Sequence, residues 1–397
     1  MSQRSFLDQL LDGAKVEWKT LGEVAKILRG ASPRPIAKFL TDDENSVPWI
    51  RIGDTSTSSK YVINTAQKIT FEGAKNSRVL KKGDFIMSNS MSFGRPYILQ
   101  IDGAIHDGWA SISDFEDILY PDYLYYFLTS NSVQTYWTNK INSGSVSNLN
   151  LDIIKTLPIP IPPLPVQEEI VRILDAFTEL TAELTAELAS ELTARKKQYN
   201  YYRDQLLSFE QGEVEWKTLG ETCDVYTGGE APESSSMSKT PTDIYKYPIF
   251  GNGAEVYGYT DRYRIDKDAV TISSIGANTG TIYFRKAHFT PIIRLKVVIP
   301  KQEGILPRYL FHALSSIAIG SKSSSVPNMN AADVKRISIP IPPLAEQERI
   351  VDILDKFDAL TNSISEGLPR EIRLRQKQYE HYRELLLSFP KAEVGPT

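Results

Sequence analysis

The chain has 397 residues, of which 41% are hydrophobic and 24% charged, with a formal net charge of -4. This balance is typical of a folded globular protein and excludes a disordered or membrane-embedded chain, and the length predicts two or three domains. One cysteine and four scattered histidines exclude an internal disulfide and disfavour a metal site, so we expect no metal. Neither an apolar run of roughly 18 residues nor a signal peptide is present, so we expect a cytoplasmic protein that binds no membrane.

The first variable segment, about 15–160, mixes turns with short apolar runs. We expect strands at 49–52 and 85–87, because each run adjoins a turn-forming Gly-Asp pair, and a helix over 123–137. The pattern predicts a mixed α+β fold.

A long helix is predicted next. After Pro165 no glycine or proline occurs up to residue 209, and proline is tolerated in the first turn, so we expect a rod of roughly 65 to 70 Å. Four leucines recur every fourth residue within a Thr-Ala-Glu-Leu repeat, namely Leu180, Leu184, Leu188 and Leu192. They form a slowly winding apolar stripe, which indicates a partner helix or partner subunit. The alternative is a single amphipathic helix lying on a domain.

The second variable segment, 213–341, resembles the first in pattern, with an expected strand at 269–272 and an expected helix at 309–317. A second helical segment, about 345–389, is interrupted by Gly367-Leu368-Pro369, which should break or kink it. The two rods are therefore not equivalent.

Two blocks of sequence occur twice. Val-Glu-Trp-Lys-Thr-Leu-Gly-Glu stands at 16–23 and again at 214–221, an offset of 198, whereas Ile-Pro-Ile-Pro-Pro-Leu stands at 159–164 and again at 339–344, an offset of 180. The stretch between the blocks is thus 18 residues longer in the first copy. Each repeat joins a variable segment to a constant one, which indicates one fold presented twice with different surfaces.

These patterns predict an α+β fold with two pseudo-repeated globular domains separated by two long antiparallel coiled-coil helices. The expected parts are a first globular domain, a central helical spacer, a second globular domain and a distal helical spacer, at 1–160, 161–212, 213–341 and 342–397.

The duplicated motifs also resemble a known family. The Trp-Lys-Thr-Leu-Gly entry, the Ile-Pro-Ile-Pro-Pro-Leu exit followed by Gln167-Glu168-Glu169 and Gln347-Glu348-Arg349, and the two long helices are similar to type I restriction-modification specificity subunits along nearly the whole chain. The Thr-Ala-Glu-Leu repeats resemble those of the IC group in particular.

The resemblance implies two target recognition domains, each reading one half of a split site in double-stranded DNA. It implies that the helices set the gap and dock two modification subunits, and that restriction subunits join through the complex. It also implies that this chain is not catalytic and binds no cofactor, whereas the assembled complex uses S-adenosylmethionine, ATP and Mg²⁺. The sequence agrees, because it lacks both the Asn-Pro-Pro-Tyr/Phe signature of adenine methylation and a Gly-x4-Gly-Lys-Ser/Thr loop.

The charge distribution fits a reader that depends on partners. Segments 18–164 and 213–341 carry net charges of +1 and +2, whereas 165–212 and 342–397 carry -4 and -2. Phosphate neutralisation normally dominates DNA affinity, so nearly neutral arms indicate that partner subunits supply much of the positive charge.

Loop-like stretches rich in hydrogen-bond donors are the candidate DNA contacts, since arginine can grip guanine and asparagine adenine with two hydrogen bonds. In the first arm they are Arg29, Ser32, Arg34, Arg51, Lys82, Ser88, Asn89, Ser90 and Arg95. In the second arm they are Tyr226, Thr227, Asn252, Ser273, Ser274 and Asn278. For any single residue a structural turn is the competing interpretation, and for the loops as groups we favour DNA contact.

Tyrosines near the end of each rod admit two interpretations. Tyr199, Tyr202, Tyr379 and Tyr382 could form a stacking platform for bases, but at helical spacing they are more typical of packing. We assign them, with the leucine stripe, to the helix pair or the partner interface.

The tetrapeptide repeat suggests a ruler. Four helical residues add about 6 Å and rotate the remainder of the helix by about 40°, and one DNA base pair adds about 3.4 Å and about 34°. Deletion of 185–188 should therefore shorten the gap between half-sites by about one base pair.

Two alternative functions of the whole chain remain. One is a methyltransferase or nuclease acting alone, and the other is a coiled-coil scaffold that binds protein.

Overall fold

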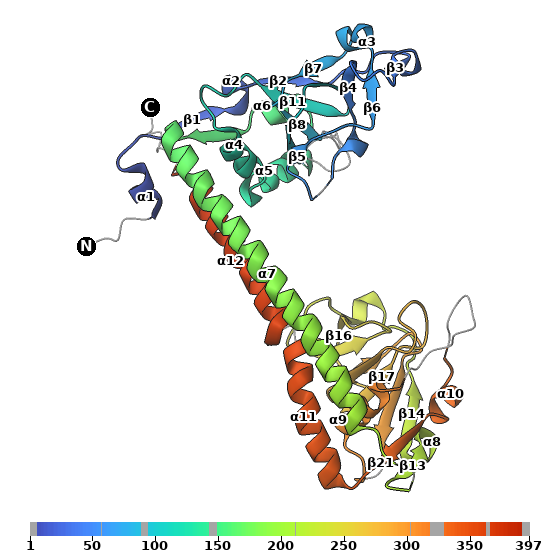
Figure 1. Ribbon diagram of the computed structural model, residues 1–397. Helices are drawn as coiled ribbons and strands as arrows, with labels where there is room; N and C mark the ends of the chain where they lie inside the picture. Colours follow the sequence, from blue (N-terminus) through green and yellow to red (C-terminus); the bar gives the residue numbers. More distant parts are fainter. Residues whose placement is uncertain are drawn as a thin grey trace. The chain divides into compact units, whose positions relative to one another are not determined.

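The computed structural model describes residues 6–56, 58–88, 94–142, 149–210, 212–301, 303–317, 329–362 and 366–390 (Figure 1). The chain divides into two compact units. Unit 1 consists of Met1–Thr185 with Leu374–Thr397, and unit 2 of Ala186–Arg373. Each unit therefore combines one variable segment with parts of both helical segments.

The two duplicated sequence blocks pair with each other inside each unit. In unit 1, β1 (Glu17–Thr20) runs antiparallel to β12 (Pro158–Ile161), with Trp18 opposite Pro160. In unit 2, β13 (Glu215–Thr218) runs antiparallel to β21 (Ser338–Ile341) in the same register. The constant sequence thus closes a ribbon that holds the two ends of each variable segment together.

Unit 1 contains two five-stranded sheets. The first has the order β3 (Leu40–Thr41), β6 (Gln67–Ile69), β4 (Val47–Ile50), β10 (Gly103–Ile105) and β7 (Arg78–Leu80). The second has the order β2 (Lys26–Arg29), β11 (Trp109–Ser113), β8 (Phe85–Ser88), β9 (Pro96–Leu99) and β5 (Tyr61–Val62). All residues of β8, β9 and β11 are buried, and β8 therefore contains the continuous apolar run Phe85-Ile86-Met87.

Unit 2 repeats this plan with fewer strands. A four-stranded sheet has the order β14 (Cys223–Thr227), β20 (Lys296–Pro300), β17 (Ala269–Ile272) and β18 (Ile282–Arg285). A three-stranded sheet has the order β16 (Val256–Thr260), β15 (Tyr247–Phe250) and β19 (Thr290–Pro291). The antiparallel set β14, β20 and β17 corresponds to β2, β11 and β8, and the parallel pair β15 and β19 corresponds to β4 and β10.

Short helices connect the strands. They are α1 (Phe6–Leu11), α2 (Leu21–Val24), α3 (Phe71–Lys75), α6 (Leu151–Lys155), α8 (Leu219–Thr222) and α10 (Ala331–Lys335), with single 3-10 turns η1 (Ile36–Lys38), η2 (Ile52–Asp54) and η3 (Ser234–Ser236). The predicted strand at 85–87 lies within β8, and the one at 269–272 is β17. The run at 49–52 stops being a strand at Ile50, because the Arg51 N–H donates to the Asp54 carboxylate and starts η2.

The helix predicted over 123–137 is wrong as a single helix. The structure has α4 (Pro121–Leu128) and α5 (Asn131–Asn142), and the Ser130 hydroxyl between them accepts a hydrogen bond from the Val133 N–H. Such a side-chain acceptor starts a new helix, because it satisfies one of the N–H groups that the first turn leaves unpaired. The helix predicted at 309–317 is observed as α9 (Pro307–Ser315).

The long helices follow the predicted positions. The first is α7 (Leu164–Leu206), 43 residues without a break. The second is divided into α11 (Leu344–Asn362) and α12 (Gly367–Leu387). Gly367 has φ +75°, and a Cβ atom there would lie 2.5 Å from the Ala359 carbonyl oxygen. Only glycine fits this break, so the predicted interruption at Gly367-Leu368-Pro369 is confirmed.

A buried glutamine joins the start of each long helix to its unit. The Gln167 side chain is fully buried, accepts from the Tyr120 N–H and donates to the carbonyl oxygens of Ile118 and Pro162. Gln347 makes the same three bonds in unit 2, with Leu306, Gly304 and Pro342. The glutamine of the duplicated motif therefore has a structural role in both repeats.

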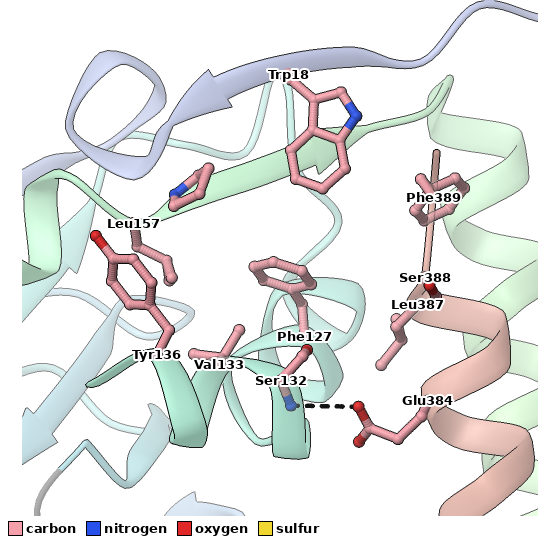
Figure 2. A pocket seen from close by; sticks show the side chains of 11 residues that line it. Trp18, Phe127, Ser132, Val133, Tyr136, Leu157, Glu384, Leu387, Ser388 and Phe389 are labelled. Atoms are coloured by element: carbon pink, nitrogen blue, oxygen red, sulfur yellow. Dashed lines mark hydrogen bonds between the residues drawn. The ribbon is translucent and has the colours of Figure 1, made fainter. Parts of the chain in front are cut away.

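The end of α12 completes the core of unit 1. Leu386, Leu387 and Phe389 are buried there, and Leu387 and Phe389 line a shallow apolar pocket of about 330 Å³ together with Trp18 and Phe127 (Figure 2). Glu384 accepts hydrogen bonds from the first two N–H groups of α5, at 2.7 Å and 3.3 Å. In unit 2 the equivalent Leu207 and Phe209, after α7, pack in the core.

Candidate nucleic-acid interface

Three loops meet at one edge of unit 1, where the parallel strands β4 and β10 end. We call these loops, residues 30–34, 51–54 and 106–108, the edge loops of unit 1. The His106 N–H donates to the Ile50 carbonyl oxygen (3.1 Å), and the Gly30 N–H donates to that of Trp109 (2.8 Å). A Cβ atom on Gly30 would lie 2.0 Å from the His106 carbonyl oxygen, so the approach of the first loop to the third requires glycine.

The same three loops meet in unit 2, at residues 228–230, 251–254 and 292–294, the edge loops of unit 2. The Ile292 N–H donates to the Phe250 carbonyl oxygen (2.9 Å) and the Gly228 N–H to that of Leu295 (2.7 Å). These two bonds match those of unit 1, so His106 corresponds to Ile292 and Asp107 to Ile293. The loops then diverge, because Ile293 and Arg294 have φ of +54° and +59° and donate to the Gly229 and Gly228 carbonyl oxygens, whereas the Asp107 N–H donates to the Ser32 hydroxyl. The two units therefore share the frame of the edge but differ in loop conformation and side chains.

Three predicted contact residues of unit 1 converge on Asp107. Arg29 Nε donates to the Asp107 carbonyl oxygen (3.1 Å), and the Ser32 hydroxyl donates to Asp107 Oδ1 (3.1 Å). Arg34 Nη2 lies 3.6 Å from Asp107 Oδ2, and the Arg34 side chain is 81% exposed. Arg51 begins the second edge loop at the end of β4. Arg51 and the other three residues thus share one edge.

The other predicted residues of the first arm lie elsewhere. The Lys82 N–H donates to Asp102, which precedes β10, so Lys82 lies at the opposite end of that strand from Asp107. Ser88 is buried opposite Trp109 and is not positioned to contact a ligand with its side chain. Arg95 lines a separate cleft of about 730 Å³ with Lys60 and Arg383. Asn89 and Ser90 lie outside the described residues.

In unit 2, Asn252 fastens the edge loops to the loop that follows β17. Its side-chain amide donates to the Ile293 carbonyl oxygen (2.5 Å), and its side-chain oxygen accepts from the Ser274 N–H (2.7 Å). Its carbonyl oxygen accepts from the Ser273 hydroxyl and from the Asn278 amide. The Ser274 hydroxyl donates to the Arg294 carbonyl oxygen.

The prediction that the Ser273 and Ser274 side chains contact DNA is wrong. Both are fully buried and both hydroxyls are used inside the protein, so they hold the loop rather than offer donors to a base. Sequence alone could not distinguish a serine that holds the loop from one that contacts DNA, because the local glycine-rich sequence is the same for both.

Tyr226 and Thr227 remain accessible at the end of β14. Tyr226 is 49% exposed, and both residues line a pocket of about 400 Å³ with Arg264 and Lys267. Thr227 Oγ1 accepts a hydrogen bond from the buried Lys296 ammonium (3.2 Å). Burial, reinforced by nearby Arg294, lowers the pKa of Lys296.

Several residues of this edge were missed by sequence reasoning. Asp107 and His106 lie in the third edge loop of unit 1, and Arg285 holds the second edge loop of unit 2 through hydrogen bonds. Arg285 donates to the carbonyl oxygens of Gly253 and Ala254, its guanidinium lies 3.8 Å from the centroid of the Phe250 ring, and burial lowers its pKa to about 10. The loops that approach these residues are separated by tens of positions in sequence, which left no local signal.

Residues 14–194 and 212–374 each match the type I restriction modification DNA specificity domain. The chain belongs to this family. It is 38% identical to the specificity subunit of the Escherichia coli type I restriction enzyme EcoR124I/EcoR124II, with 99% of each chain covered. It is 32% identical to that of the E. coli enzyme EcoprrI, with 92% of this chain and 93% of the relative covered. The resemblance stated from the sequence is thereby confirmed.

Two solved structures share the fold. The HsdS subunit of Thermoanaerobacter tengcongensis matches with a TM-score of 0.55 at 20% identity, covering 94% of this chain and 95% of that one. A chain from a structural study of complex assembly and conformational transition in a type I restriction-modification system matches with a TM-score of 0.65 at 19% identity, covering 94% and 97%. At this identity the likeness concerns the fold of two repeated units of helices and strands.

The helices of this specificity-family chain contact each other within each unit through the predicted tyrosines. In unit 1 the Thr178 hydroxyl donates to the Tyr379 hydroxyl oxygen (3.0 Å), and Tyr382 stacks on Phe177 at 5.5 Å between ring centroids. In unit 2, Tyr202 stacks on Phe357 at 5.6 Å, and the buried Tyr199 hydroxyl lies 3.2 Å from His312 Nδ1. All four tyrosines therefore contact a neighbouring helix, Tyr199 from a buried position and Tyr202 and Tyr382 with 40% and 37% of the side chain exposed.

The four leucines of the stripe are each partly accessible to solvent. Leu180 is 50% exposed, and Leu184, Leu188 and Leu192 are half-buried. Partner binding by the leucines and tyrosines stays a prediction.

Within the described ranges, no helix is long and apolar enough to span a membrane, and no group of three or more His, Cys, Asp or Glu side chains is arranged to hold a metal ion.

Proposed function

We propose that this chain is the DNA-recognition subunit of a type I restriction-modification complex, in which each unit reads one half of a bipartite site in double-stranded DNA. The observation that carries the proposal is the repeated edge. The two units share two backbone bonds at this edge but present loops of different chemistry, Asp107 with arginines in one and Ile293 with Arg294 in the other. Such a pair suits two unlike half-sites recognised by one fold.

The helices are the proposed spacer and docking element. As an antiparallel coiled coil, α7 with α11 and α12 sets the gap between half-sites, and the accessible sides of Leu180, Leu184, Leu188 and Leu192 contact two modification subunits. The acidic helical segments and nearly neutral globular segments support this division of labour, because the positive charge that neutralises phosphates must then come largely from those partners. Restriction subunits join through the same complex.

In this proposal the partner subunits carry out the catalytic reactions of the complex. The assembled complex takes up S-adenosylmethionine for methyl transfer to adenine, and ATP with Mg²⁺ for cleavage. The described residues of this chain supply binding and positioning, and the chain itself contributes no catalytic step.

Footprinting of DNA with the purified chain, with and without modification subunits, tests the proposal. We expect protection of two short DNA segments flanking an unprotected gap, and only when the modification subunits are present. The purified chain alone should transfer no methyl group and cut no DNA. Methyl transfer or cleavage by the chain alone would establish an independent enzyme. Sequence-selective protection in the presence of modification subunits would exclude a scaffold that binds protein, and the absence of such protection would contradict the proposal.

A further inference from the structure

Asp107 lies at the centre of the edge loops of unit 1 and organises their polar side chains. Its carboxylate is contacted by the Ser32 hydroxyl at 3.1 Å, by His106 Nε2 at 3.0 Å and by Arg34 Nη2 at 3.6 Å. Its carbonyl oxygen accepts from Arg29 Nε. Although surrounded by donors, the Asp107 side chain is 33% exposed, so it lies at the surface of the edge rather than in the core.

Unit 2 closes the corresponding loop through a different set of bonds. Its equivalent residue is Ile293, which is 42% exposed and has φ +54°, and the Ile293 and Arg294 N–H groups donate to the Gly229 and Gly228 carbonyl oxygens. In unit 1 the Asp107 N–H instead donates to the Ser32 hydroxyl, and the Asp107 carboxylate contacts Ser32, His106 and Arg34. The carboxylate therefore belongs to a polar arrangement that is particular to unit 1.

Arg34 is the neighbour with the most freedom to reach a ligand. Its side chain is 81% exposed, and its shortest approach to Asp107 is 3.6 Å, from Nη2 to Oδ2. A long exposed arginine normally samples many rotamers, and the neighbouring carboxylate favours those that keep the guanidinium beside it. At this exposure the guanidinium still has N–H groups to offer a ligand.

An arginine held in this way suits guanine. The O6 and N7 atoms of guanine accept two hydrogen bonds from one guanidinium, which is the commonest specific contact in the major groove. A carboxylate beside the arginine disfavours a phosphate at the same place by charge repulsion. The combination therefore favours a base edge over the DNA backbone.

We propose that Arg34 reads a guanine in the half-site recognised by unit 1, and that Asp107 is the positioning residue that holds Arg34 for this contact. The proposal rests on the proposed function and names the base that one unit reads. Asp107 acts through Arg34, so the two residues govern the same base pair.

Methylome sequencing of cells that express each variant with the modification subunits tests this pairing. We expect R34K, which keeps the charge but loses the two-pronged geometry, to relax one guanine position of one half-site by about tenfold or more. D107N should relax the same position, and the double variant should be no more relaxed than R34K. The other half-site should be unchanged. D114N is the control, because Asp114 pairs with Lys26 at the far end of β11.

Distinct results would overturn the inference. If R34K retained full guanine selectivity, or if D107N relaxed a different base pair from R34K, Arg34 and Asp107 would not form one reading unit. Because Arg34 is exposed, R34K reports on the guanine contact even where a change at Asp107 lowers the yield of folded protein. Failure of the unaltered chain to direct methylation to any bipartite site would instead contradict the proposed function.

Discussion

At the scale of single residues, the structure separates side chains that hold loops from side chains that remain accessible. Asn252 is half-buried and uses both its amide nitrogen and its amide oxygen to join the second edge loop of unit 2 to Ile293 and Ser274. Arg34 makes one ion pair and is largely exposed. Both were predicted as DNA contacts from the same kind of sequence signal, a polar residue beside glycine or proline.

The Asn252 bonds predict that substitution of Asn252 destabilises unit 2. Asn252→Ala leaves the Ile293 carbonyl oxygen and the Ser274 N–H without their partners, which should lower the free energy of unfolding by about 1 to 3 kcal/mol. Urea denaturation measures this change, with the nearby exposed Glu255→Ala as the control. Equal stability of the two variants would show that the Asn252 bonds contribute nothing.

The hydrogen bonds of Asp355 predict that the folding stability of unit 2 depends on pH. Burial alone would raise the pKa of Asp355, but hydrogen bonds from His312 and Arg308 outweigh it and lower the pKa. A lowered pKa in the folded state contributes stability that is present above the unfolded value of about 3.9 and is lost as the pH falls through the folded value.

We therefore expect D355N to destabilise the protein near neutral pH, by about 1 to 2 kcal/mol because the Asp355 side chain is 38% exposed. Below pH 4 the difference from the unaltered chain should shrink. Thermal unfolding at a series of pH values measures both. A difference that stayed constant down to pH 2 would mean that the Asp355 charge is not involved.

At the scale of elements, the duplicated motifs were the most informative part of the sequence. The Trp-Lys-Thr and Ile-Pro-Ile-Pro blocks form one antiparallel ribbon in each unit, and the following glutamine joins that ribbon to the long helix. The long α7, the break at Gly367 and the three strands proposed from apolar runs were also predictable, because each depends on local periodicity or on a backbone conformation that one residue type adopts.

Other elements could not be predicted because long-range contacts decide them. The Ser130 cap is a local signal for the break between α4 and α5, but serine also occurs within helices and does not decide the break alone. The capping of α5 by Glu384, 253 positions from Asn131, reinforces the break and leaves no signal in the local sequence. The convergence of Arg29, Ser32 and Arg34 on Asp107 likewise depends on the register of β2 with β11 and of β4 with β10.

The buried glutamines predict matched effects in the two units. Gln167→Leu and Gln347→Leu each leave one backbone N–H and two carbonyl oxygens without their partners, so each should lower the free energy of unfolding by about 1 to 3 kcal/mol. The exposed neighbour change Glu168→Gln should have an effect below about 0.5 kcal/mol. Differential scanning calorimetry compares the three, and a stable Gln167→Leu variant would contradict the structural role of the motif.

At the scale of the whole molecule, the Thr-Ala-Glu-Leu repeat predicts a measurable length. Deleting 185–188 removes one four-residue unit from α7, about 6 Å and about 40° of rotation, against about 3.4 Å and about 34° for one base pair. The gap between half-sites should shorten by about one base pair while both half-sites keep their sequences. Mapping the methylated sites of the deletion variant measures the gap, and an unchanged gap would end the ruler hypothesis.

In the proposed function, one chain reads two unlike half-sites with two copies of one fold. Methylome sequencing of a host that expresses the unaltered chain with its modification subunits is the decisive measurement. We expect one bipartite motif, with a methylated adenine in each half and a gap of fixed length between them. A single uninterrupted motif, or methylation without sequence preference, would contradict recognition by two units.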